Sequence, residues 1–231
     1  MAISTELIKQ LREKTGAGMM DVRNALAEAE GDVEKATEIL RQKGAATAEK
    51  KSARATGEGK VHATILPGGQ VGAMVEVNCE TDFSANNERF LKLVDAISKE
   101  AADRSHVDVA SLLDAAHAEA VSLKTLLADT IGAVKENMAV SRFVRYELEG
   151  RKGLIHAYIH AGGKIGVLVE ANAEKGETAQ QAAFAQLVKD VAMQIAAVAP
   201  ECVSREEVPA DEVEAEKRVE MGKEDILAKP E

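Results

Sequence analysis

The 231-residue sequence is poor in aromatic residues and cysteines and has no tryptophan. It contains four Phe, two Tyr and two Cys. Cys79 and Cys202 are too few and too far apart for a disulfide framework or a metal cluster, which predicts a protein of a reducing compartment. No stretch reaches the roughly 18 apolar residues of a membrane helix, and the charged start has no apolar signal region. These absences predict a cytoplasmic protein that contacts no membrane.

Positive charge is also in deficit. The chain has 29 Lys and Arg against 39 Asp and Glu, a formal net charge of −10. This charge repels phosphate backbones and argues against nucleic acid as the main partner. Because 45% of the residues are hydrophobic, the chain can bury one large core or two or three small ones. The composition therefore predicts a globular protein whose partner is another protein.

Residues 1–44 have the pattern of three short helices. Ser4 or Thr5 can cap the first helix, Asp32 can cap the third, and Gly44 can end it. Apolar residues recur at helical spacing in each segment, as expected for a small bundle.

Two further segments are defined by composition. Residues 45–59, "AATAEKKSARATGEG", are small, polar and aperiodic, which predicts a linker whose basic charge is solvated. Residues 201–231 are strongly acidic and helical in propensity, but their apolar face is thin. A helix there would need a partner to pack against.

An internal repeat organises the middle of the chain. "KVHATILPGGQVGAMVEVN" from Lys60 is echoed by "LIHAYIHAGGKIGVLVEAN" from Leu154, at a constant offset of 94 residues. Each copy has two alternating apolar runs around a Gly-Gly turn, the pattern of a β-hairpin, and an amphipathic helix follows. The predicted fold is α+β, with a duplicated antiparallel hairpin-plus-helix core. Its first repeat spans 60–139, including a helical insertion from 107, and its second spans 140–200.

A fifth strand is expected at the start of the second repeat. "VSRFVRYEL" from Val140 alternates as a strand and can add to the second hairpin. The first copy has no such strand before it, because the equivalent register falls in the basic linker. Its third strand must come from elsewhere or be absent.

The repeat also serves as an internal control, since features of one copy alone are candidates for function. Asp82 and Phe83 fall just before a predicted helix whose N-cap is Ser84, and the second copy has no aromatic there. A hydrophobic staple from Phe83 fails, because the fourth helical residue is Glu88. Phe83 is therefore either packed against another domain or a solvent-facing anchor for a protein interface.

Few residues suggest chemistry. No GxxxxGK[ST] loop is present, which argues against nucleotide binding by that motif. Cys79 with His62 or His156 could serve as nucleophile and base, but the second copy has Ala173 at the position of the cysteine. The remaining histidines lack metal-ligand spacing. The residues alone predict no cofactor, no metal and no enzyme, while a Cys79-centred enzyme and an N-terminal binding module stay open as alternatives.

Several motifs together resemble bacterial elongation factor Ts, the exchange factor for the GTPase elongation factor Tu. They are "LREKTGAGMMDVRNAL", "VEVNCETDF", "IGAVKEN", "HAGGKIGVLV" and "VAMQIAAVAPECVSREEVPADEVEAEK", which span nearly the whole chain. The resemblance implies a ubiquitin-associated-like domain at 1–44, a duplicated core, and a helical hairpin that 201–231 begins. It implies release of GDP from elongation factor Tu without any bond change, and it leaves open a homodimer or a complex with two copies of each protein.

The resemblance also implies site residues. Asp82 and Phe83, flanked by Thr81 and Ser84, would be a wedge beside the magnesium site of the GTPase. Two further groups match positions that contact the partner: near its phosphate-binding loop, Ile131, Gly132 and His160; on the N-terminal domain, Arg12, Met19 and Met20. Methionines are more often core than contact, so this implication shifts the two methionines to exposed contacts. The alternative function is a non-enzymatic adaptor acting through the N-terminal domain.

Longer members of the family continue beyond "GKEDILAKPE" with a segment that returns along the hairpin and adds a helix and a strand to the core. The resemblance therefore predicts that this chain, ending at Glu231, lacks that part.

Overall fold

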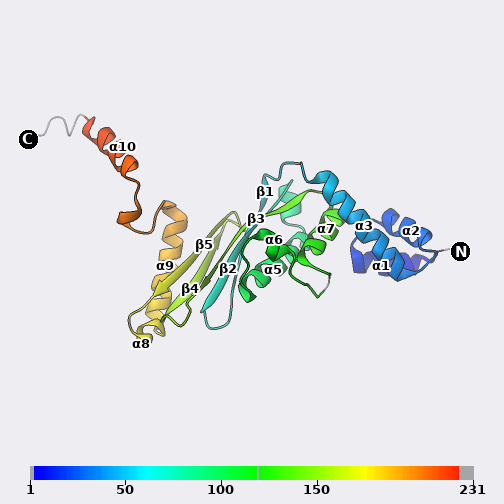
Figure 1. Cartoon of the computed structure of the whole chain (residues 1–231), viewed down its shortest axis with the longest axis horizontal. Helices are drawn as coiled ribbons and strands as arrows, with labels where there is room; N and C mark the ends of the chain where they lie inside the picture. Colours follow the sequence, from blue (N-terminus) through cyan, green and yellow to red (C-terminus); the bar gives the residue numbers. More distant parts are fainter. Residues whose placement is uncertain (1–2, 119, 224–231) are drawn as a thin grey trace, which may run out of the picture. The chain divides into compact units, whose positions relative to one another are not determined.

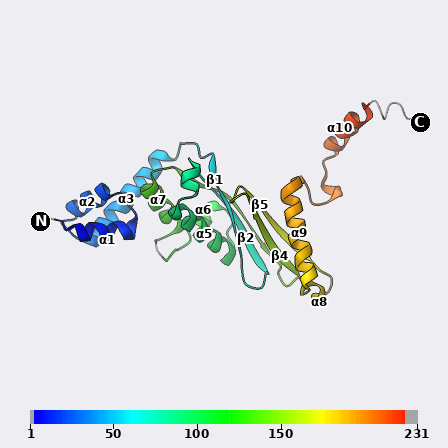
Figure 2. The same ribbon diagram turned by 180° about the vertical axis from the view of Figure 1, so that it is seen from behind.

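The computed structural model describes residues 3–118 and 120–223, and its contacts divide the chain into two units, Met1–Ala196 and Ala197–Glu231. In the first unit, three helices are followed by two small antiparallel sheets, with helices inserted between the second and third strands of the first sheet and further helices after the second sheet (Figures 1 and 2). In the second unit, a 3-10 turn, Arg205–Glu207, precedes α10, Ala210–Met221. The combination of helices with small antiparallel sheets confirms the predicted α+β class.

Helices α1 (Thr5–Thr15), α2 (Met19–Glu28) and α3 (Val33–Lys51) form the N-terminal bundle. The two predicted caps are confirmed. The Ser4 hydroxyl accepts a hydrogen bond from the Leu7 amide, and the Asp32 carboxylate accepts from the amides two and three residues after it. The apolar stripes meet in one small core, which includes Leu11, Val22, Ala25, Leu26, Ala36 and Leu40.

The first sheet has three strands in the order β1-β2-β3. Helices from the middle of the chain cover one face of this sheet. The sheet and these helices together enclose the main core. The bounds are β1 Glu58–Ile65, β2 Val71–Cys79, α4 Asp82–Ala85, α5 Glu88–Asp103, α6 Val109–Leu113, α7 Leu123–Val134 and β3 Met138–Glu147.

Strand β3 belongs to the first hairpin, so the prediction that it adds to the second hairpin is wrong. It runs antiparallel to β2, with Met138 opposite Cys79 and Val140 opposite Val77. The physical reason is burial, since Met138 and Val140 lie in the main core. The missing third strand of the first copy is therefore supplied from beyond the helical insertion, and the repeat boundary at residue 140 falls inside a strand of the first sheet.

The second sheet pairs β4 (Gly153–His160) with β5 (Ile165–Asn172), and α8 (Gly176–Ala179) and α9 (Ala182–Val198) follow. Gly59 faces Asn78 in the first hairpin, and the residues 94 positions later, Gly153 and Asn172, face each other in the second. This identical register confirms that the hairpin is duplicated. Among the described residues the second sheet has two strands.

The two copies differ in how well their helices are covered. Leu93 on α5 is 1% exposed, whereas its repeat equivalent on α9, Leu187, is 58% exposed. Helix α5 contacts all three strands of its sheet together with α6 and α7. On α9 only Val188 and Ala192 are buried. The same apolar pattern thus gives a sealed core in one copy and a partly open face in the other.

The prediction that Gly44 ends the third helix is wrong, because α3 continues to Lys51. Gly44 is the point where α3 crosses α7: a Cβ added to Gly132 would lie 2.9 Å from the Gly44 Cα. Glycine at both positions allows the two backbones to approach closely, and the alanines after Gly44 favour helix. The predicted linker 45–59 therefore shrinks to an irregular connection at residues 52–57.

Candidate functional site

The most exposed aromatic of the described chain stands on a corner between β2 and α5. Strand β2 ends at Cys79, and the single-turn helix α4 begins at Asp82. The side chain of Thr81 caps this turn by accepting from the Ser84 amide at 3.3 Å. Phe83 is the second residue of the turn and is 85% exposed. The alternative that it packs against another part of the first unit is therefore excluded.

The predicted cap at Ser84 is wrong. Ser84 lies inside α4 and is buried, and the N-cap of α5 is Asn87, which accepts from the Arg89 amide at 2.9 Å. The sequence pattern merged two helix starts into one, because α4 is only four residues long.

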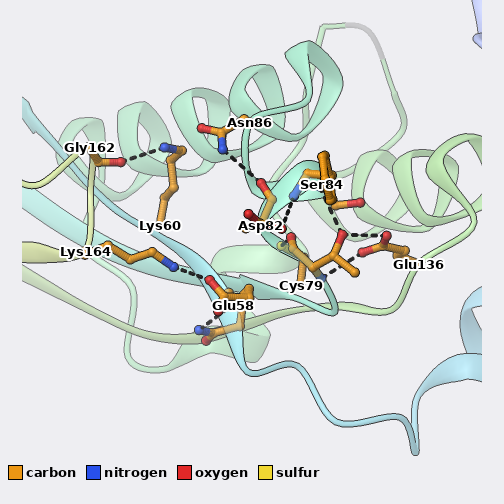
Figure 3. A network of polar contacts seen from close by, with 12 residues as sticks. Glu58, Lys60, Cys79, Asp82, Ser84, Asn86, Glu136, Gly162 and Lys164 are labelled. Carbon is orange, nitrogen blue, oxygen red and sulfur yellow. Dashed lines mark hydrogen bonds and ion pairs between the residues drawn. The ribbon is translucent and has the colours of Figure 1, made fainter.

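A carboxylate from outside the corner holds Thr81 in place. Glu136, just after α7, accepts from the Thr81 amide at 3.0 Å and from the Thr81 hydroxyl at 2.8 Å (Figure 3). A reciprocal bond runs from the Asn137 amide to Glu80 at 2.6 Å, and this bond is the main reason that the pKa of Glu80 is lowered. Bonds to charged groups are among the strongest in proteins. The corner is therefore braced on its core side.

Asp82 is held by local bonds. One of its carboxylate oxygens accepts from the Phe83 amide at 2.9 Å, and its carbonyl accepts from the Asn86 side chain at 2.9 Å (Figure 3). Its carboxylate lies in the first turn of α4 and is exposed. The corner thus presents an anionic group and a phenyl ring side by side to solvent.

The turn of the second hairpin lies against β1, the strand that pairs with β2. Lys60 donates to the carbonyl of Gly162 at 2.6 Å, and Lys164 is ion-paired with Glu58 (Figure 3). The hydrogen bond from Lys164 to Glu58 is the main reason that the pKa of Lys164 is raised. His160 ends β4 beside this turn and is exposed, with its ring stacked on Tyr158 at 5.9 Å between centroids.

The N-terminal residues form a separate exposed group. Arg12 lies in α1, and Met19 and Met20 open α2 with 58% and 59% of their surface exposed. An ion pair of 3.1 Å between Asp21 and Lys135 joins the start of α2 to the end of α7. This pair links the methionine surface to the element that also braces the corner.

Ile131 and Gly132 are placed differently from the other candidates. Ile131 is 3% exposed and belongs to the main core, and Gly132 packs on Gly44 at the helix crossing. The side chain of Ile131 is therefore not presented at the surface. Both residues position α7 in this structure.

Sequence reasoning missed Glu136, Glu80 and Asn137 as supports of the corner. The signal available was the motif "IGAVKEN", whose final Glu and Asn are Glu136 and Asn137. Their role became visible only when the fold brought them to Thr81.

The structure gives little support to catalysis by Cys79. The thiol is buried and contacts the Thr81 carbonyl at 3.2 Å, and burial raises its pKa to about 11. A thiol with so high a pKa is a poor nucleophile at neutral pH. Within residues 3–118 and 120–223, no group of three or more His, Cys, Asp or Glu is arranged to hold a metal ion. No helix in the same residues is long and apolar enough to cross a membrane.

An exposed aromatic on a braced corner and a separate exposed methionine pair are typical of a protein that binds another protein. Residues 80–231 match the family model described as elongation factor TS. The chain is 45% identical to elongation factor Ts of Nostoc punctiforme and 46% identical to that of Nostoc sp., in each case over 99% of this chain and 74% of the relative. Elongation factor Ts of Trichlorobacter lovleyi is 42% identical over 100% of this chain and 74% of the relative. The chain belongs to the elongation factor Ts family.

Proposed function

We propose that this protein binds elongation factor Tu and promotes the exchange of GDP for GTP by disturbing the magnesium and phosphate site of that GTPase. The proposal rests on membership of the elongation factor Ts family and on one observation above all: the Phe83 ring is 85% exposed on a corner that is braced from its own core. The protein makes and breaks no covalent bond in this function.

The wedge acts through differential binding. Elongation factor Tu without nucleotide and magnesium accepts the Phe83 ring and the neighbouring Asp82 carboxylate better than the loaded form does. Linkage then requires that this protein and the nucleotide each lower the affinity of elongation factor Tu for the other by the same factor. Burying one Phe side chain contributes roughly 1.5–3 kcal/mol. The ring alone therefore changes the equilibrium constant for binding to elongation factor Tu about 10- to 100-fold. The remainder comes from other contacts.

The other contacts are assigned to three places. The ubiquitin-associated-like bundle at residues 1–44 grips the GTPase with Arg12, Met19 and Met20. His160 makes a further contact from the second hairpin. Ile131 and Gly132 contribute by positioning α7, whose end carries the braces of the corner. Because translation takes place in the cytoplasm, the protein acts there, with no membrane and no direct nucleic acid contact.

Release of labelled GDP from elongation factor Tu tests this function. The parent chain is expected to accelerate release, and Phe83→Ala to lower the acceleration about tenfold or more; Asp82→Ala is expected to lower it as well. Val107→Ala is the matched control, because Val107 is 93% exposed on another loop. An active parent with unchanged rates in both corner variants would remove the wedge.

A further inference from the structure

A cleft lies where the N-terminal bundle meets the core. Its walls come from α1, α2, α3, α5 and α7, and its volume is about 430 Å³. Cavities that hold small ligands in proteins fall in the range of about 300–1,000 Å³. None of the residues proposed to contact elongation factor Tu lines it, although Gly132, which positions α7, does.

The lining of this cleft is cationic, although the chain as a whole carries a net charge of −10. Only two of its lining residues are acidic, Asp21 and Asp129. The basic lining residues are Lys14, Arg41, Lys43, Lys50, Arg89 and Lys135. A concave wall of one charge sign focuses the electric field and concentrates ions of the opposite sign.

Three of these cations already have carboxylate partners. Lys135 pairs with Asp21 at 3.1 Å, Arg41 with Asp129 at 3.7 Å, and Lys43 with Glu28 at 3.0 Å. Both acidic lining residues are thereby engaged.

The other three cations have no such partner. Lys14, Lys50 and Arg89 form no ion pair with any carboxylate in the part of the chain that the structure describes. The nearest carboxylate in sequence to Arg89 is Glu88, which is bound by Lys92 at 2.8 Å. These three cations come from different helices and line one cleft, where all three are exposed and available to an anion.

Arg89 is also placed with unusual closeness to the bundle. A Cβ on Gly16 would lie 1.7–2.1 Å from the three outer atoms of the Arg89 guanidinium. The guanidinium therefore lies directly against the backbone at the end of α1, two residues after Lys14. The guanidinium is thus seated at the seam between bundle and core.

We propose that this cleft binds a small polyphosphate anion, recognised through two adjacent phosphate groups such as those of pyrophosphate or a nucleoside diphosphate. Arginine binds phosphate oxygens through its planar fork, and lysines supply point charges. Adjacent phosphates bring several negative charges into a small volume, which matches three free cations around a small-molecule cavity. Because the chain has no GxxxxGK[ST] loop, recognition depends on side-chain cations and not on a cradle of backbone amides.

Calorimetric titration of the full chain with pyrophosphate at low ionic strength tests the proposal, which does not depend on elongation factor Tu. Saturable binding is expected, with affinity that falls as salt rises. Arg89→Ala and Lys50→Ala are each expected to weaken binding about tenfold. Lys99→Ala is the control, since it removes a cation from the same helix as Arg89, paired with Asp95 and outside the cleft, and should leave binding unchanged. Circular dichroism confirms that each variant is folded.

Further arms identify the ligand. If GDP and ADP bind as tightly as pyrophosphate, the site recognises the diphosphate alone. If either binds more tightly, the site also contacts the nucleoside. Absence of saturable pyrophosphate binding, or an equal loss in Lys99→Ala, overturns the proposal. A polyglutamate peptide that binds more tightly than pyrophosphate also overturns it, in favour of an acidic protein partner.

Discussion

The amide of Val61 donates a hydrogen bond of 2.7 Å to the carbonyl of Gly163, which joins the first strand of one hairpin to the turn of the other. The repeat-equivalent bond also forms, from the Ile155 amide to the Gly69 carbonyl at 2.8 Å. The Gly-Gly turn of each hairpin is therefore hydrogen-bonded to the first strand of the other hairpin. The strand that carries Val61, β1, pairs along its length with β2, which ends next to the Phe83 corner.

The interface between the hairpins has no room for extra atoms. A Cβ on Gly166 would lie 2.5 Å from Val61 Cγ1, and one on Gly72 would lie 2.8 Å from Ile155 Cγ2. We expect Gly166→Ala and Gly72→Ala each to destabilise the protein by about 1–3 kcal/mol in urea unfolding. Gly57→Ala is the control, because nothing lies within 4 Å of its added Cβ. Equal stability of all three variants would contradict this close packing.

The two copies of the core helix predict unequal costs for the same substitution. Leu93→Ala should destabilise by about 2–5 kcal/mol, because it leaves a cavity in a sealed core. Leu187→Ala should cost well under about 1 kcal/mol, because that side chain is 58% exposed. Chemical denaturation of both variants provides the comparison. Similar losses would show that α9 is covered in solution.

The brace on the Phe83 corner predicts an indirect effect on exchange. Glu136→Gln replaces the carboxylate that accepts both Thr81 bonds, and a bond to a charged group contributes about 1.5–3 kcal/mol. We expect the Glu136→Gln variant, which retains Phe83, to release GDP from elongation factor Tu more slowly than the parent chain does. Thr81→Val should act in the same direction through the lost cap.

Thr37→Val is the matched control for the brace, because the Thr37 hydroxyl bonds only within its own helix. Exchange rates of the brace variants that equal those of the parent and of Thr37→Val would argue against a positioning role.

The two cysteines should differ in reactivity. Burial raises the pKa of Cys79 to about 11 from an ordinary value of 9.0, so its thiolate fraction at pH 8 falls about 100-fold. We expect Cys202 to react with a thiol reagent in the folded protein while Cys79 stays unlabelled until urea is added. Mass spectrometry of Cys79→Ser and Cys202→Ser distinguishes the two sites. Rapid labelling of Cys79 would reopen the enzyme alternative.

Local elements were predictable because their signals are local. The caps at Ser4 and Asp32, the Gly-Gly turns and the periodicity of the strands depend on residues within a few positions of one another. Gly44 misled because a glycine that ends a helix and a glycine at a helix crossing have the same local sequence signature. Its partner, Gly132, lies 88 residues away.

The site was predictable only in part. The internal comparison singled out Phe83 because one copy has the aromatic and the other does not, but it left two alternatives for that ring. The brace joins Thr81 to Glu136, 55 residues later, and the burial of Ile131 depends on packing between several elements, so neither has a local sequence signal.

The amino-acid sequence by itself determined the α+β class, the duplicated hairpin and the helix starts at Ser4 and Asp32, since side-chain periodicity and turn chemistry act over short distances. Only the tertiary structure decided that β3 joins the first hairpin, that Phe83 faces solvent and that three free cations share one cleft. The physical reason is that burial and charge pairing arise between elements distant in the chain, where one apolar pattern has several possible partners.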